Sequence, residues 1–164
     1  MWQRTIYFLS LLFVALSLAP AMAHLLELPN KINLSRDDYL IVQQIYRGWS
    51  LLGIVIFPAL LSTLALTITL RHQRKAFLLA LVAFLCIVGA QIVFWTYTFP
   101  ANQATNNWTT LPENWTTLRR QWEYSHATGA LLNLLAMISL SASVLVRTPM
   151  RSELSVGAGL NSIK

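Results

Sequence analysis

Charged side chains are scarce in this chain. Of its 164 residues, 11% are Asp, Glu, Lys or Arg, while 55% are hydrophobic. A soluble domain of ordinary composition carries about 25% charged residues. The shortage excludes a soluble globular domain as the main body of the chain and indicates a membrane protein.

Cysteine is almost absent as well. Cys86 is the only one, so the chain forms no internal disulfide and no cysteine-based metal cluster. Its place inside an apolar run favours the role of a small buried residue. The sequence also lacks a phosphate loop, a nucleophile elbow and a dinucleotide fingerprint, which excludes the enzyme classes that depend on those motifs.

Long apolar runs are what the chain has instead, at 5–28, 49–70, 76–99 and 127–146. About 20 apolar residues are needed for a helix to cross a hydrocarbon core of roughly 30 Å. Backbone groups in lipid must be bonded within their own segment, and the alternation of a β-barrel strand is missing. The sequence therefore predicts an all-α membrane protein, an antiparallel bundle of four transmembrane helices.

The flanks of the runs set the predicted helix ends. Ser35-x-x-Asp38 is a capping motif, from which we expect a helix to run through Tyr39–Arg47 into the second run. The third helix is expected to end at Phe99-Pro100. One domain, 1–146, then holds helices at about 5–28, 43–70, 76–99 and 113–146, and a Gly- and Ser-containing tail, 147–164, is predicted to be flexible and cytoplasmic.

Basic residues predict the orientation. The short loop Arg71–Lys75 is strongly basic, which places it in the cytoplasm together with both termini. The outer side then holds five acids and five bases, so the whole formal charge of +6 faces the cytoplasm. This asymmetry reflects orientation in a membrane and not nucleic-acid binding, which needs a basic folded face. We expect a multi-pass protein of a bacterial inner membrane, and nothing in the sequence fixes an oligomeric state.

The first run has two interpretations. Met1–Arg4 is a basic start and Ala21-Met22-Ala23 resembles a signal-peptidase site, so cleavage before His24 would leave three helices. Against cleavage, the apolar stretch continues to Leu28. Four polar residues also recur every seven positions, as on one helix face: Ser10, Ser17, His24 and Lys31. We therefore expect the first helix to be retained.

Tryptophan marks the outer loop before the fourth run. Asn107-Trp-Thr-Thr-Leu111 returns as Asn114-Trp-Thr-Thr-Leu118, and tryptophans stand seven apart at 108, 115 and 122. Pro112 suits the first position of a helix, so the second repeat is predicted to start an amphipathic helix that continues into the fourth. The tryptophans fit an interfacial aromatic belt or a lid over a pocket.

Polar residues gather at the outer ends of all four predicted helices. Polar groups facing lipid are costly, so these side chains should face inward and line a polar pocket open to the outer face. The fourth helix aligns Arg119, Glu123, His126, Ala130, Asn133, Met137 and Ser141 at 100° per residue. Shorter stripes are Gln43, Arg47 and Ser50 in the second helix, Gln91, Trp95, Thr98 and Asn102 in the third, and His24 and Glu27 in the first.

The spacing His24-x-x-Glu27 and Glu123-x-x-His126 pairs an imidazole with a carboxylate one helical turn apart. These four residues are the candidate acid–base groups, with Arg47 or Arg119 to hold an anion. Candidate residues for binding a small apolar or aromatic substrate are Arg47, Gln91, Asn102, Trp115 and Trp122. No cofactor is predicted. A single metal held by two His and two Glu is a minority alternative to structural Arg–Glu and His–Glu pairing.

The second half resembles a known family. Phe99-Pro-Ala-Asn102, the tryptophan-rich loop and Trp115-x-x-Leu-Arg119-x-x-Trp122-x-x-x-His126 are similar to the four-helix membrane family of unknown function that includes the fungal anthrone oxygenases. The likeness covers about 95–146. It implies that Asn102, Arg119, Trp122 and His126 form a shared polar site, and that an oxygenase of this kind acts on electron-rich polyphenols without metal or flavin.

Three functional hypotheses follow. The first is a small-molecule membrane enzyme, an oxygenase-like oxidoreductase with His126 or His24 as base. The second is a non-catalytic membrane subunit that binds a partner or lipid through an exposed Trp108–Trp115 face. The third is a metal-binding or ion-conducting bundle, which the apolar inner halves of the helices disfavour.

Overall fold

A computed structural model describes residues 2–146 of the chain, and this part contains helices and no strand. Four helical stretches are long and apolar enough to cross a membrane: Trp2–Lys31, Trp49–Thr69, Arg74–Ala104 and Trp115–Leu145. The prediction of an all-α protein with four such helices is confirmed for these residues. The predicted flexible tail, 147–164, lies outside them.

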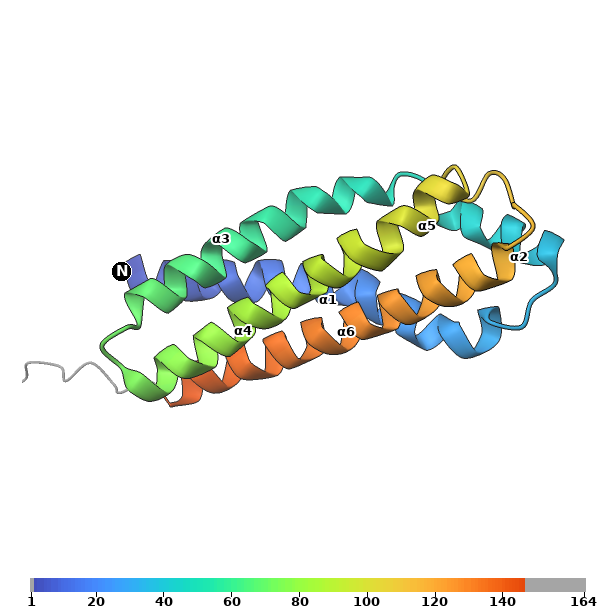
Figure 1. The fold of residues 1–164 in the computed structure, drawn as a ribbon. Coiled ribbons are helices and arrows are strands. Elements are labelled where there is room, and N and C mark those ends of the chain that lie inside the picture. Colours follow the sequence, from blue (N-terminus) through green and yellow to red (C-terminus); the bar gives the residue numbers. More distant parts are fainter. Residues whose placement is uncertain (1, 147–164) are drawn as a thin grey trace, which may run out of the picture.

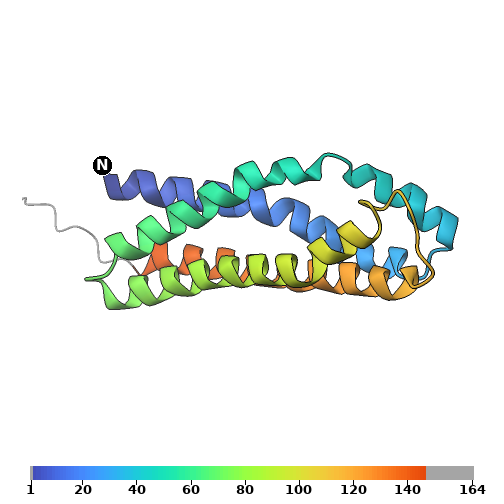
Figure 2. The same ribbon diagram turned by 45° about the horizontal axis from the view of Figure 1, so that its top comes forward.

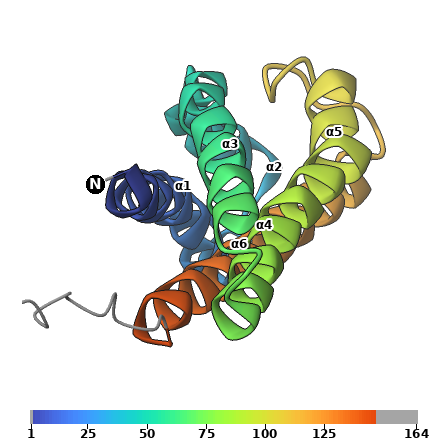
Figure 3. The ribbon, with the colours of Figure 1, turned by 90° about the vertical axis from the view of Figure 1, so that its left-hand side faces the viewer.

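The long helices form an elongated bundle (Figure 1). Its main members are α1 (Trp2–Lys31), α3 (Gly53–Thr69), α4 (Arg74–Val93) and α6 (Trp115–Leu145). The start of α1, the α3–α4 turn and the end of α6 lie at one end, whereas α2 (Arg36–Gln43) and α5 (Phe99–Ala104) lie at the other (Figures 1 and 2). The view along the bundle shows α3 and α6 on opposite sides of its axis (Figure 3). Both α1 and α4 pack against α3 and α6.

Small residues let the helices approach closely. On α4, Ala76, Ala80 and Ala83 are at most 1% exposed, and they pack in one core cluster with Leu66 of α3 and Leu140 of α6. Close backbone approach through small residues is the usual packing mode of helices in lipid. Many other large apolar side chains point outward; among the most exposed are Phe8, Leu61, Phe57, Ile54 and Ile92.

The second helix is broken near the end of the bundle that carries α2 and α5. Ser35 caps α2, its Oγ accepting a hydrogen bond from the backbone N of Asp38 at 3.3 Å, so the capping prediction is confirmed. The prediction of one continuous helix through Arg47 into the membrane is wrong. A 3-10 turn at Gln44–Tyr46 ends at Arg47, and Gly48 is left-handed with φ 88°. Glycine adopts this conformation at little cost. A second 3-10 turn, Trp49–Leu52, leads into α3.

The third helix runs further than predicted. It does not end at Phe99-Pro100, because α4 passes through a π-helical segment, Phe94–Thr98, into α5, which ends at Ala104. Pro100 lacks the N–H that a regular helix would donate to the carbonyl of Thr96, and its ring would collide with that carbonyl. The wider π turn directly before it accommodates the proline, which then stands in the first turn of α5.

The fourth helix starts later than predicted. Pro112 is not its first residue, because α6 begins at Trp115, whose N donates to the Pro112 carbonyl at 3.0 Å. Before it, the backbone is left-handed at three successive residues, with φ 48° at Asn106, 54° at Asn107 and 60° at Trp108. This turn folds the loop back over the end of the bundle, where Trp108 is only 3% exposed.

Candidate functional site

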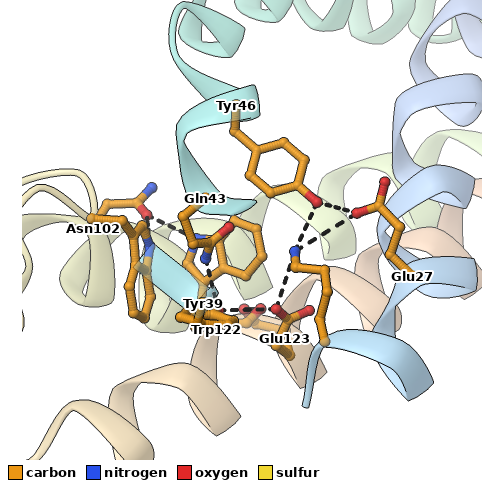
Figure 4. A network of polar contacts seen from close by, with 10 residues as sticks. Glu27, Tyr39, Gln43, Tyr46, Asn102, Trp122 and Glu123 are labelled. Carbon is orange, nitrogen blue, oxygen red and sulfur yellow. Dashed lines mark hydrogen bonds and ion pairs between the residues drawn. The ribbon is translucent and has the colours of Figure 1, made fainter. Parts of the chain in front are cut away.

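Polar side chains from α1, α6 and the α2 arm meet at the end of the bundle that carries α2 and α5 (Figure 4). The α2 arm is α2 together with the 3-10 turn that follows it, residues 36–46. Lys31, the last residue of α1, lies at the centre and is 4% exposed. Its Nζ is 3.2 Å from Glu123 Oε1 and 3.7 Å from Glu27 Oε2, and it donates to the Tyr46 hydroxyl at 2.7 Å. A buried ammonium is tolerated when carboxylates and hydrogen bonds compensate it in this way.

The α2 arm supplies two phenols to the carboxylates. The Tyr39 hydroxyl donates to Glu123 Oε1 at 2.9 Å and accepts from Gln43 Nε2 at 2.7 Å, while the Tyr46 hydroxyl donates to Glu27 Oε2. Burial raises the pKa of both phenols, and the neighbouring carboxylates raise it further, Glu123 for Tyr39 and Glu27 for Tyr46. Both phenols therefore remain protonated hydrogen-bond donors to the carboxylates.

Aromatic rings enclose the Lys31 ammonium. Its Nζ lies 4.4 Å from the centre of the Tyr46 ring and 4.7 Å from that of Trp122. Trp122 is fixed in turn, because its indole N–H and that of Trp108 both donate to Asn102 Oδ1, at 2.8 Å and 3.1 Å. Cation–π contact and the two carboxylates thus act on the same charge.

Two histidines stack next to this centre. The rings of His24 and His126 are 4.0 Å apart with an interplanar angle of 29°. Trp122 lies edge-on to both, at 5.1 Å from His24 and 4.2 Å from His126, and Trp49 lies edge-on to His24 at 5.2 Å. An imidazole is the side chain best suited to exchange a proton near neutral pH.

Buried polar atoms without a partner concentrate here. Within residues 2–146, five buried side-chain N or O atoms lack a hydrogen-bond partner, and four of them belong to His24, Gln43, Arg119 and Glu123. Buried polar groups in native proteins are nearly always bonded, to protein or to water. A cluster of unsatisfied atoms is typical of a place that exchanges water, protons or a ligand.

The structure brings six of the ten predicted site residues together. Around Lys31 and the stacked rings lie His24, Glu27, Asn102, Trp122, Glu123 and His126. An ion pair across the bundle from Glu27 or Glu123 was expected to end on Arg or His, and it ends on Lys31 instead.

Four predicted residues are placed differently. Arg119 is 9% exposed, but it donates to the Leu34 carbonyl at 2.7 Å and stacks on Trp115 at 4.6 Å, so both side chains hold the loop before α2. Arg47 is exposed and donates to Gln44 Oε1 at 2.7 Å, because the break at Gly48 turns it away from the bundle. Gln91 is half-buried on α4 and takes no part in the network.

Two of the predicted polar stripes hold only in part, because an irregular segment interrupts each helix, although Thr98 and Asn102 of the third helix face inward as predicted. The Gln43, Arg47, Ser50 stripe is interrupted by the break, and only Gln43 is buried. In the third helix Trp95 is 59% exposed, because the π segment shifts the phase of the helix. The stripe on α6 holds from Arg119 through Asn133, although Ser141 at its far end is exposed.

Sequence reasoning missed Lys31, Tyr39, Tyr46 and Trp49 as site residues. Lys31 was assigned only to the outer basic residues and to the seven-residue stripe. Its spacing from Glu27, four positions on the same helix, could have identified it as a partner of that carboxylate. The three aromatic residues carry no such spacing, since the break at Gly48 decides where their side chains lie.

The Lys31 ammonium occupies the space between the carboxylates where a cation would be bound. Among the described residues, no group of three or more His, Cys, Asp and Glu side chains is arranged to hold a metal ion. The two-His, two-Glu metal site stays an untested minority alternative, and in this structure the Lys31 ammonium lies between Glu27 and Glu123.

The predicted open polar pocket is a closed network in this structure, since Lys31, Glu123 and His24 are at most 4% exposed. Two open grooves lie on the described part of the bundle. One of about 500 Å³ runs between the end of α4, the π segment and the outer face of α6, and includes Tyr97, Gln121 and Tyr124. The other, of about 280 Å³, lies between Pro20 and the turn Gly48–Leu52.

Comparison of the chain with protein-family models, with curated proteins and with solved structures gives no match. The arrangement itself provides two carboxylates around an ammonium, protonated phenols and stacked imidazoles in a largely buried site, where the Glu27 side chain is 34% exposed. Such groups can take up a proton, release one and hold a negatively charged oxygen.

Proposed function

We propose that the four helices cross a membrane as an antiparallel bundle, with both termini in the cytoplasm of a bacterial cell and the network on the outer side. The support is the basic loop Arg71–Lys75, which lies at the end of the bundle opposite α2 and α5 (Figures 1 and 2). Basic residues in short loops favour the cytoplasmic side.

In this proposal the network lies in the interfacial layer, and helix length supports that position. Twenty residues, about 30 Å of helix, separate Arg4 from His24, Leu70 from Ser50, Lys75 from Trp95 and Val146 from His126. Measured from the basic end, the hydrocarbon core therefore ends close to the stacked histidines. Lys31, Glu123 and Tyr39 lie beyond it, among the lipid headgroups.

The network is an acid–base site for a small apolar or aromatic molecule. The observation that carries this proposal is the juxtaposition of an enclosed ammonium with the stacked pair of His24 and His126. A structural ion pair needs neither the second imidazole nor unpartnered atoms on His24, Gln43 and Glu123. In this proposal His126 and His24 accept the proton, and Lys31 holds the oxygen of a phenolate.

The reaction class is oxygenase-like oxidoreduction, which the family resemblance suggests and the site groups can serve. A base removes a proton from an activated CH₂ next to phenolic rings, and the carbanion reacts with O₂. The sum is CH₂ plus O₂ giving C=O plus H₂O, so the carbon loses four electrons and O₂ gains four. The side chains need supply only proton transfer and a positive charge for the oxyanion.

The alternative is a non-catalytic subunit that binds a partner or lipid through the tryptophan-rich loop. Two observations weigh against it. Trp108 is 3% exposed and hydrogen-bonded to Asn102, and Trp115 is half-buried against Arg119. Little tryptophan surface is therefore left on the loop for a partner.

Oxygen uptake with anthrone as the probe tests the proposal. The purified protein in nanodiscs should consume one O₂ per anthrone above the uptake of empty nanodiscs. His126→Asn should lower kcat by about 100-fold or more, the usual effect of removing a general base. His72→Asn, an exposed histidine at the opposite end, is the matched control and should keep full activity. No uptake above that of empty nanodiscs, or equal rates in both variants, would remove the oxygenase proposal.

A further inference from the structure

The smaller groove lies beside the stacked histidines. It is lined by Pro20 of α1 and by Gly48, Trp49, Leu51 and Leu52 of the turn that precedes α3. These side chains are apolar, and the volume of about 280 Å³ lies at the small end of ligand pockets. The groove therefore fits one small ring system and not a large polar molecule.

The groove opens where the hydrocarbon core ends. His24 and Ser50 stand about 30 Å of helix from the basic end, and Pro20 and Leu52 lie within one turn of that level. Leu51 and Ile54 beside it are 69% and 72% exposed, as expected of side chains that contact lipid. A molecule dissolved in the membrane reaches this groove without passing through water.

Trp49 separates the groove from His24. Its ring lies edge-on to His24 at 5.2 Å and to Tyr46 at 4.9 Å, and it also lines the groove. Behind it stand the stacked rings of His24 and His126 and the ring of Trp122. Among the described residues, Trp49 is the one aromatic residue that lines the groove, and its ring favours a flat ring, which stacks on it, over a flexible acyl chain.

The backbone next to Trp49 departs from regular α-helix on both sides of Gly48. Gly48 is left-handed with φ 88°, and no atom lies within 4 Å of where its Cβ would be. Short 3-10 turns flank it on both sides, Gln44–Tyr46 and Trp49–Leu52, and their hydrogen bonds are weaker than those of an α-helix. Rotation about Gly48 would swing Trp49 away from His24 without unfolding α3.

We propose that this groove binds a small apolar ring compound taken from the hydrocarbon of the membrane, and that Trp49 closes its passage to His24 and His126. The proposal rests on the proposed function, because it names the route and the substrate class of the same site. Trp49 is a gate and takes no part in proton transfer.

Modification of His24 by diethylpyrocarbonate tests the gate without requiring activity. This small apolar reagent acylates imidazole nitrogens, and peptide mass spectrometry distinguishes His24 from exposed His72, the internal reference. In nanodiscs, Trp49→Ala should speed modification of His24 by about fivefold, since it removes two ring contacts and the shield. Trp49→Phe keeps a ring and should stay near wild type. Trp95→Ala, an exposed tryptophan of the π segment, is the matched control and should have no effect.

Protection identifies the occupant. In the Trp49→Ala variant, 1-naphthol should slow modification of His24 and leave His72 unchanged, whereas 1-decanol should not protect. Equal protection by decanol would make the groove an acyl-chain site and overturn the proposal. An unchanged rate of His24 modification in Trp49→Ala, with an unfolding midpoint equal to wild type, would also overturn the proposal.

A second variant decides if the unfolding midpoint of Trp49→Ala falls. It carries Leu52→Cys in a Cys86→Ala background, and a bulky apolar maleimide attached to that cysteine should block modification of His24. Naphthol protection without anthrone oxidation would reject the oxygenase reaction and retain the groove.

Discussion

At the scale of single residues, the buried Lys31 ammonium organises the polar network at the end of the bundle that carries α2 and α5. A buried ammonium costs several kcal/mol unless it is compensated. Here Glu123, Glu27 and the Tyr46 hydroxyl supply the compensation, and the Trp122 ring adds cation–π contact. In the proposed function, this ammonium holds the oxyanion of the substrate in place of one of its carboxylates.

The raised pKa of the Tyr39 phenol predicts that the protein loses unfolding free energy at high pH. Burial and the adjacent Glu123 raise the pKa of its phenol above the ordinary value of about 10. Stability from the protonated phenol is complete below pH 10 and falls as the pH rises above it, because only the unfolded chain ionises there. We expect the unfolding midpoint in detergent to fall less between pH 9 and 11 in Tyr39→Phe than in wild type. Tyr97→Phe, at a 51% exposed position, should follow wild type, and identical slopes in all three would contradict this origin.

Two neighbouring arginines provide a second comparison. Arg119 is buried, bonded to the Leu34 carbonyl and stacked on Trp115, while Arg120 is exposed. Arg119→Gln should cost about 1–3 kcal/mol of unfolding free energy, the range for a buried charge-assisted hydrogen bond. Arg120→Gln should stay within about 0.5 kcal/mol of wild type. Chemical unfolding in detergent measures both, and equal losses would make Arg119 an ordinary loop charge.

Residue patterns predicted part of the site. Polar side chains are costly in lipid, so the sequence predicted that four of them face inward, and the structure brings them together. They are His24, Glu27, Glu123 and His126. The positions of Arg47 and Gln91 could not be derived in this way, because helical phase holds only along an uninterrupted helix. A glycine at 48 and a proline at 100 each change that phase.

At the scale of elements, the break between α2 and α3 matters most. A continuous helix would carry Tyr39 and Tyr46 along the direction of α3. The left-handed Gly48 instead lets the α2 arm turn its phenols onto Lys31 and Glu123. The length of the apolar runs predicted the long helices, whereas such a break depends on one backbone angle that run length does not report.

Replacing glycines tests the break. Gly48→Ala should destabilise the protein by about 1 kcal/mol, because alanine is strained at φ 88° although its Cβ would meet no atom. Gly53→Ala is the matched control: it also has free space, and it begins α3 at an ordinary helical angle. We expect that variant to be stabilised by up to about 1 kcal/mol, since alanine favours helix. Thermal unfolding of the two variants compares them, and equal shifts would argue against a left-handed Gly48.

At the scale of the whole molecule, the bundle has two different ends. The basic end consists of tight turns around small apolar contacts, with the α3–α4 loop Arg71–Gln73 exposed or half-exposed. The other end extends beyond the length that hydrocarbon requires and carries nearly all buried charge. We interpret the basic end as the part that anchors the protein in the membrane and the other end as the part that carries the proposed site.

Orientation in the membrane can be measured by thiol labelling. In a Cys86→Ala background, we expect Asn106→Cys to react with a membrane-impermeant maleimide added to intact cells. Gln73→Cys should react only after the cells are opened, because its loop is predicted to be cytoplasmic. The reverse pattern would place the network on the cytoplasmic side and both termini outside.

The ion pair between Lys31 of α1 and Glu123 of α6 holds the site together, and a double-mutant cycle measures it most directly. Lys31→Met and Glu123→Gln should each cost about 3–5 kcal/mol of unfolding free energy, because the first leaves Glu123 buried without its ammonium and the second leaves Lys31 with only the more distant carboxylate of Glu27. The double variant should cost less than the sum of the single variants, with a coupling of about 2 kcal/mol or more. The control cycle combines Lys75→Met and Glu113→Gln, two exposed positions at opposite ends of the bundle, and should show no coupling energy. Additive losses of unfolding free energy at Lys31 and Glu123 would contradict an ion pair that holds the network together.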